Sequence, residues 1–272
     1  MRIVIAEDAV LLRAGLVRLL TEHVPAKANA RRKTFAPTKA MNFGSIVHSM
    51  VLGAGPELIV YEHDGRTKPG KEERALAKPL IESQAAVGMT KAERQKALDM
   101  VDALRSHAEV VAILDATRSE VSGFWQEGGA WMRSRYDLLS ETRAWDYKTA
   151  QDSSRRGFQK AMADYGYHQQ AEFYLRGLTA LGHPAGKRPF RFIVQETEAP
   201  YLAQIHTPDD EAMETARELN DRAIRIFVES NKSGIWAGYP ELAAEETPLP
   251  NYYYFDHEEL LGSPETVELK LS

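Results

Sequence analysis

The 272-residue chain contains no cysteine, which excludes a disulfide framework and any cysteine-based zinc site. It also has no apolar run of membrane-spanning length, no leader-like amino terminus, no internal repeat and no low-complexity segment. These absences predict a cytoplasmic protein without a membrane partner. The apolar fraction of 43% is enough for the core of one sizeable domain.

A strong excess of basic residues is also missing, since the formal net charge is −5. The overall charge therefore does not indicate nucleic-acid binding. Basic residues do cluster locally, in residues 27–39 and again at Arg66, Lys68 and Lys71. Such clusters can follow a phosphate backbone while acidic groups gather at a metal. The alternative is that each run is a solvated loop.

Two strands joined by a tight turn are predicted in the middle of the chain. Residues 120–127 and Ala130–Asp137 have strand character, and Gly128-Gly129 between them is a hairpin signal because both glycines tolerate positive φ. A third strand, Ala144–Thr149, follows. Asp137 should therefore lie beside the strand that carries Asp146, although a strand-terminating turn residue is the common alternative for Asp137.

The third strand carries the most informative feature, the sequence Asp146-Tyr147-Lys148. Because strand side chains alternate, Asp146 and Lys148 should share one face, while Trp145 and Tyr147 pack on the other. A charged pair on an otherwise apolar strand needs a partner if it is buried, and carboxylates suit Mg²⁺. An exposed, solvated pair is the simpler alternative.

The remaining pattern predicts an α/β fold with a central mixed sheet flanked by helices. Gln170 and Tyr174 lie four residues apart, hence on one face of a predicted helix that ends before Gly182. The other predicted elements are helices over 158–163, 165–181 and 208–232, and strands over 189–197 and 201–206.

Several segments in this order resemble the phage-type exonucleases of the exodeoxyribonuclease VIII (RecE) group, within the PDDEXK nucleases. An ordered set is more specific than any single motif, and the resemblance covers roughly residues 40 to 255. It implies a restriction-endonuclease-like core. The matching segments are Asn42–His48, Arg66–Glu73, Glu120–Trp125, Arg133–Asp137, Asp146–Thr149 and Asp164–Tyr174.

The resemblance implies a role for each matching residue. His48, Asp137 and Asp146, with the backbone carbonyl of Tyr147, correspond to metal ligands, and Lys148 to the lysine that positions the attacking water. Glu120 corresponds to a further acidic active-site residue. Gln170 and Tyr174 correspond to a motif that lines the site and contacts DNA. Apart from the resemblance, the basic residues Arg66 and Lys71 are candidates for phosphate contacts, as are Arg133 and Arg135, which share one face of their strand; a surface charge ladder is the alternative for the two strand arginines.

The activity implied by the resemblance is a Mg²⁺-dependent 5′-to-3′ exonuclease, with Mn²⁺ as an alternative metal. It would act on double-stranded DNA ends and leave 3′ single strands for a strand-annealing recombinase. A homo-oligomer in the cytoplasm of a bacterium or phage-infected host is implied as well. An endonuclease or structure-specific nuclease with the same motifs is the alternative within this class.

The amino terminus has a different resemblance. Residues 1–23 are similar to the first strand and helix of a response-regulator receiver, including the acidic pair Glu7 and Asp8, but the later strand–helix repeats are missing. We therefore expect an extension over residues 1–25 and a nuclease domain over residues 26–272. Ile3–Ile5 should pack on the nuclease body or on a neighbouring subunit, or else the segment should be disordered or helical. A degenerate receiver-like binding module is the alternative from another class.

Overall fold

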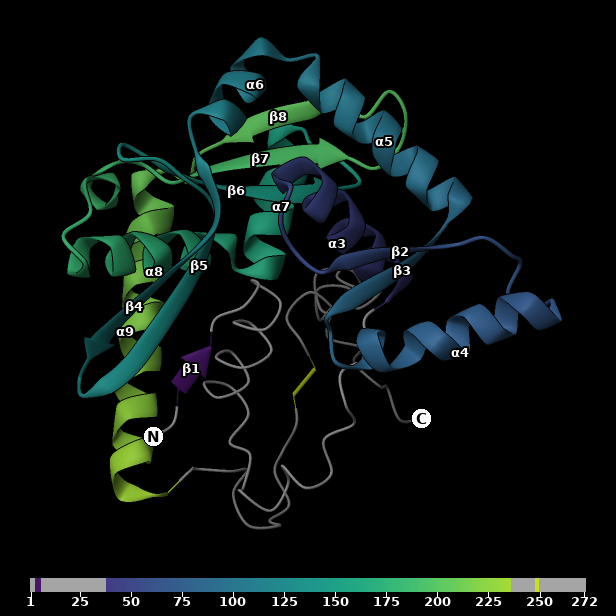
Figure 1. Cartoon of the computed structure of the whole chain (residues 1–272). Helices are drawn as coiled ribbons and strands as arrows, with labels where there is room; N and C mark the ends of the chain where they lie inside the picture. Colours follow the sequence, from purple (N-terminus) through teal and green to yellow (C-terminus); the bar gives the residue numbers. More distant parts are fainter. Residues whose placement is uncertain (1–2, 6–37, 236–247, 250–272) are drawn as a thin grey trace, which may run out of the picture. The chain divides into compact units, whose positions relative to one another are not determined.

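The computed structural model describes residues 3–5, 38–235 and 248–249, and the compact unit to which nearly all of them belong spans Met1–Gly238. Helices cover both faces of a mixed six-stranded sheet (Figure 1). The predicted α/β architecture with a central mixed sheet flanked by helices is therefore confirmed. None of the helices in the described part of the chain combines the length and apolar character that a membrane crossing needs.

The sheet runs in the order β1-β5-β6-β7-β8, and β4 pairs with the other edge of β5. Only β1 with β5 and β6 with β7 are parallel pairs. The strands are β1 (Ile3–Ile5), β4 (Arg118–Glu127), β5 (Ala130–Leu139), β6 (Ala144–Ala150), β7 (Arg191–Glu196) and β8 (Ala203–His206).

The predicted hairpin is confirmed, and its two glycines are the reason for its register. Gly128 and Gly129 adopt φ of 58° and 84°, a conformation that favours glycine at both central positions of the turn. Glu127 therefore pairs directly with Ala130, and the ladder continues from there to Arg118↔Leu139. This register decides which side chains of β4 and β5 lie opposite each other.

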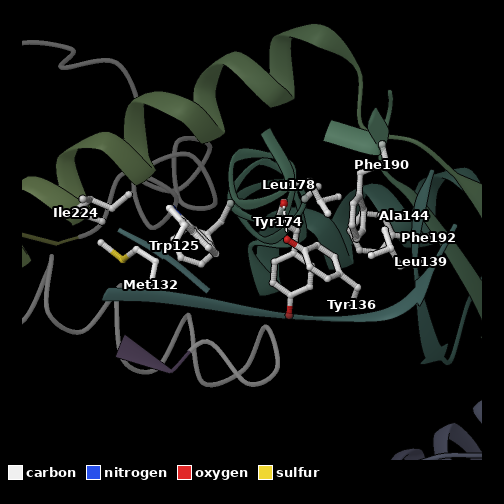
Figure 2. Close-up of a cluster of buried hydrophobic side chains, with 14 of the residues drawn as sticks. Trp125, Met132, Tyr136, Leu139, Ala144, Tyr174, Leu178, Phe190, Phe192 and Ile224 are labelled. Carbon is white, nitrogen blue, oxygen red and sulfur yellow. Dashed lines mark hydrogen bonds between the residues drawn. The ribbon is translucent and has the colours of Figure 1, made fainter. Parts of the chain in front are cut away.

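One face of the sheet packs against α7 (Arg155–Tyr165), α8 (Tyr167–Ala180) and α9 (Asp210–Ser233). Figure 2 shows the aromatic centre of this cluster. Its large side chains stack edge to face or tilted, as aromatic pairs prefer; the Phe190 and Phe192 rings, for example, lie 5.2 Å apart. The short 3₁₀ helix η3 (Pro184–Lys187) connects α8 to β7.

The opposite face packs against α3 (Lys39–Leu52), α5 (Lys91–Arg105) and α6 (Ala108–Asp115). The second cluster on this face takes Trp145 and Tyr147 from β6, whereas Ala144 and Ala150 of the same strand contact the first cluster. This alternation follows from the period of two in a strand. It also confirms that Trp145 and Tyr147 pack inward together.

A separate two-stranded parallel sheet is formed by β2 (Glu57–Tyr61) and β3 (Ala86–Thr90), connected by α4 (Lys68–Glu82). In the described part of the chain, β2 pairs with β3 rather than with a strand of the central sheet.

Most predicted elements exist, with bounds shifted by a few residues. The helix predicted over 158–163 begins earlier, at Arg155. Gly166, whose φ of 67° ends α7 and begins α8, moves the start of the next helix from residue 165 to Tyr167. Residues 6–23 of the receiver-like segment and the basic residues 27–33 lie outside the described residues. The proposed division at residue 25 therefore stays a prediction.

Candidate active site

Two acidic side chains lie across from each other on the hairpin. Ser119 pairs with Leu138 and Val121 with Tyr136, so the same register sets Glu120 opposite Asp137. This is the one position at which the ladder pairing is missing, and Glu120 has a φ of 55° there, rare for a residue with a side chain. Like charges directly opposite each other destabilise a sheet unless a cation lies between them.

A third acid continues the row. The pairing of β5 with β6 consists of Leu138↔Trp145 and Leu139↔Ala144, and the two strands then diverge. Asp137 and Asp146 are the next residues along the two strands, at the fork. The Tyr147 backbone N–H donates to Asp137 Oδ2 at 2.9 Å, which fixes the carboxylate of β5 against β6. The predicted placement of Asp137 beside the Asp146 strand is thus confirmed.

The imidazole of His48 joins this row from α3. Ile46, Val47 and Val51 of α3 are buried in the second cluster, which anchors the helix on the sheet. The imidazole Nε2 lies 3.0 Å from Asp137 Oδ2, and Nδ1 lies 3.7 Å from Glu120 Oε1. A ring nitrogen of His48, a carboxylate oxygen of Glu120 and a carboxylate oxygen of Asp137 all lie within 4.8 Å of one another.

The electrostatics of this group are dominated by burial and by opposite charge. Burial opposes the charged imidazole, but the carboxylates of Asp137, Glu120 and Asp146 outweigh it and raise the pKa of His48 to about 9. Burial likewise opposes ionisation of Asp137, yet His48 and Lys148 together hold the pKa of that carboxyl below its usual value. Positive charge is therefore strongly favoured between the acids.

Asp146 is held from two sides. The Lys148 ammonium lies 2.6 Å from Asp146 Oδ1, and the Gln170 amide of α8 donates to Oδ2 at 2.5 Å. The Asp146 side chain is 2% exposed and that of Lys148 13%, so the solvated-pair alternative does not apply. The predicted same-face placement of Asp146 and Lys148 agrees with their contact.

The donor set fits a hard divalent cation. Carboxylate oxygens are the ligands that Mg²⁺ and Mn²⁺ prefer, and the row brings three carboxylates together on β4, β5 and β6, with an imidazole near two of them. The compact group contains Glu120 with His48 and Asp137, and Asp146 is not among its members. The ligand set implied by the resemblance is His48, Asp137, Asp146 and the Tyr147 carbonyl, so it contains Asp146 and does not contain Glu120.

The predicted DNA contacts fall into different environments. Arg135 pairs with Glu120 (Nε to Oε2, 2.7 Å), and Arg133 is half-buried on the same face of β5, 3.5 Å from Ser122 Oγ. Arg135 therefore lies beside the acidic row. Arg66 instead pairs with Asp64. Lys71 is exposed on α4, the helix that connects the two strands of the small sheet.

Gln170 and Tyr174 do not lie on a surface. Each is 2% exposed. Gln170 contacts Asp146, whereas Tyr174 is a core residue whose backbone carbonyl accepts from the Tyr136 hydroxyl at 3.0 Å (Figure 2). Their burial gives Gln170 a part in positioning Asp146 and Tyr174 a part in packing, and it leaves neither available for direct contact with DNA in this conformation.

Sequence reasoning missed two features. The opposition of Glu120 and Asp137 could have been found by counting outward from the Gly128-Gly129 turn, because a two-residue hairpin fixes every opposite pair. The second is Gln195 of β7, which is fully buried and accepts from the Tyr147 hydroxyl at 2.6 Å while donating to the Met100 carbonyl at 2.8 Å. No local pattern announces that contact.

Comparisons with known proteins agree with this architecture. The crystal structure of a "Putative exonuclease" from Eubacterium rectale superposes with a TM-score of 0.56 at 14% identity, covering 87% of this chain and 89% of that one. That likeness shows the fold. The structure of SSO0001 matches with a TM-score of only 0.28 at 16% identity, over 66% of this chain and 85% of that one, and carries no argument.

No curated protein matches the sequence. A family match does exist, and it extends over residues 19–244, which include every element of the site described above. The fork in the central sheet, with its acids and lysine, lies inside that range. The chain belongs to the family described as "PDDEXK-like domain of unknown function (DUF3799)".

Proposed function

We propose that this protein is a divalent-metal-dependent deoxyribonuclease. The observation that carries the proposal is the acidic row Glu120, Asp137 and Asp146 across three neighbouring strands, with His48 and Lys148 in contact with it. Phosphodiester cleavage needs a cation at the scissile phosphate, a positioned water and compensation of the developing negative charge. Each requirement has a matching group here.

The chain's own residues would hold and orient the reacting groups. His48, Glu120 and Asp137 would hold the metal, with Asp146 and the Tyr147 carbonyl as further ligands when it is bound. The metal would polarise the scissile phosphate and make the attacking water more acidic. Lys148, held by Asp146, would orient that water and offset charge on the phosphate oxygens, and Gln170 would keep Asp146 in position.

The finer assignment is a 5′-to-3′ exonuclease that acts on double-stranded DNA ends and leaves 3′ single strands. It is supported by the resemblance to the exodeoxyribonuclease VIII group and by the description of the Eubacterium rectale protein as an exonuclease. Mg²⁺, with Mn²⁺ as the alternative, follows from the oxygen-rich donor set. A strand-annealing recombinase as partner, a homo-oligomer and a cytoplasmic location belong to the same proposal.

The test compares linear and covalently closed circular duplex DNA, with Mg²⁺, with Mn²⁺ and with chelator. An exonuclease degrades only the linear form, only with metal, and releases a 5′ label before a 3′ label. Cleavage of the circle at the same rate would favour the endonuclease alternative. A protein that cleaves neither form under any metal condition, while Asp137→Asn leaves its metal affinity unchanged, would contradict the proposal.

A further inference from the structure

An exposed aromatic side chain lies close to the lysine of the site. Tyr165 is the last residue of α7 and is 48% exposed. Gly166, with a φ of 67°, turns the chain directly into α8, so Tyr165 and Tyr167 come from two helices that meet at this glycine. Their rings lie 5.6 Å apart with an interplanar angle of 34°.

Tyr167 connects this exposed ring to the site. The Lys148 ammonium lies 5.2 Å from the centre of the Tyr167 ring, a cation–π distance. The Tyr167 ring thus contacts both the Lys148 ammonium, 5.2 Å from its centre, and the Tyr165 ring, whose centre lies 5.6 Å away. Tyr165 is therefore one ring removed from the lysine of the site.

The far side of Tyr167 is supported by the core. Its ring stacks on Phe158 at 6.0 Å with an interplanar angle of 19°, and Phe158 in turn stacks on His206 at 4.4 Å. Phe158 is 4% exposed. The inner end of this column of rings is therefore fixed by packing, whereas the outer end, Tyr165, presents aromatic surface to solvent.

We propose that Tyr165, supported by Tyr167, stacks on an unpaired nucleobase next to the phosphate that Lys148 contacts. This inference rests on the proposed function and adds a substrate feature to it: the nucleotide that flanks the scissile bond is unstacked from its neighbour when it binds. Every nucleobase has a π face, so stacking on an aromatic side chain supplies affinity without sequence preference. Duplexes with a frayed or unpaired end are the preferred substrates.

The kinetic experiment uses four variants of the full chain. Tyr165→Phe keeps the ring, Tyr165→Leu keeps apolar bulk without a π system, and Tyr165→Ala removes both. Leu181→Ala is the matched control, because Leu181 is also 48% exposed but lies at the opposite end of α8. Thermal melts establish that each variant is folded.

We expect KM for a linear duplex to rise about tenfold in Tyr165→Ala and Tyr165→Leu, within the range that loss of one stacked base produces. Their kcat should stay within about twofold of wild type, because the groups at the acidic row are intact. Tyr165→Phe and Leu181→Ala should behave like wild type. With wild type, an abasic site at the flanking nucleotide should raise KM by the same factor of about ten. With Tyr165→Ala, the abasic site should raise KM no further.

A binding measurement separates this inference from the proposed function. With 2-aminopurine at the flanking position, and Ca²⁺ in place of Mg²⁺, wild type should quench the fluorescence and Tyr165→Ala should not. If wild type cleaves DNA and Tyr165→Ala shows the same KM and the same quenching as wild type, the stacking inference alone is overturned. If quenching depends on Tyr165 but DNA is not cleaved, the stacking is supported and the proposed nuclease activity is overturned. If neither quenching nor cleavage occurs, the stacking inference and the proposed function are both overturned.

Discussion

Replacing Lys148 by methionine removes the ammonium but keeps most of the apolar stem, so it isolates the charge. Under the proposed function this charge orients the attacking water and offsets charge in the transition state. Loss of one such preorganised group typically costs about a hundredfold in rate, which corresponds to about 2.7 kcal/mol. We expect single-turnover cleavage of linear duplex DNA to slow by about that factor or more.

The same substitution should also destabilise the metal-free protein. Lys148 and Asp146 form a largely buried pair, with side chains 13% and 2% exposed, and removal of Lys148 leaves the buried Asp146 carboxylate without its ammonium counter-ion. Breaking such a pair costs about 3 kcal/mol or more.

The double variant Asp146→Asn with Lys148→Met tests the pairing, because it removes both charges and should recover much of the lost stability but none of the activity. Urea denaturation without and with Mg²⁺ measures the free energy of unfolding, and single-turnover kinetics measure the rate of cleavage. Lys160→Met, on the exposed side of α7, is the matched control and should change neither. A folded Lys148→Met protein that cleaves at the wild-type rate would refute the role of this lysine.

Three further outcomes follow from single contacts. In the metal-free protein, His48 has a folded-state pKa of about 9 against an ordinary value of 6.5, so its stabilising effect is complete below about pH 6.5 and is lost as pH rises through 9; His48→Gln should therefore cost more stability at pH 6 than at pH 10 in urea titrations, and an equal cost would argue against this pairing. Tyr147→Phe leaves the buried Gln195 oxygen without its donor and should cost about 1–3 kcal/mol in the same assay. Phe192→Ala removes a fully buried ring from the first cluster and should cost about 3–5 kcal/mol by thermal melting, and a loss below 1 kcal/mol would contradict the packing.

Part of the site could be derived from local pattern alone. The Gly128-Gly129 turn fixes the register of β4 and β5, and strand alternation puts Asp146 and Lys148 on one face. Both rest on short-range geometry, which has few solutions. Gln170 and Tyr174 show the limit: their shared helix face was predicted, but whether that face meets DNA or the sheet depends on how α8 docks, and it docks on the sheet.

The sequence by itself determined the α/β class, the hairpin, and the placement of Asp137 beside the strand that carries Asp146, because each depends on residues that are close along the chain or are joined by one tight turn. Only the tertiary structure decided that Glu120 rather than Asp146 completes the compact group with His48 and Asp137. It also decided that Gln195 holds Tyr147 and that Tyr165 stays exposed beside Tyr167. These contacts join distant segments, and they are fixed by the packing of helices on the two faces of the sheet, which no local pattern specifies.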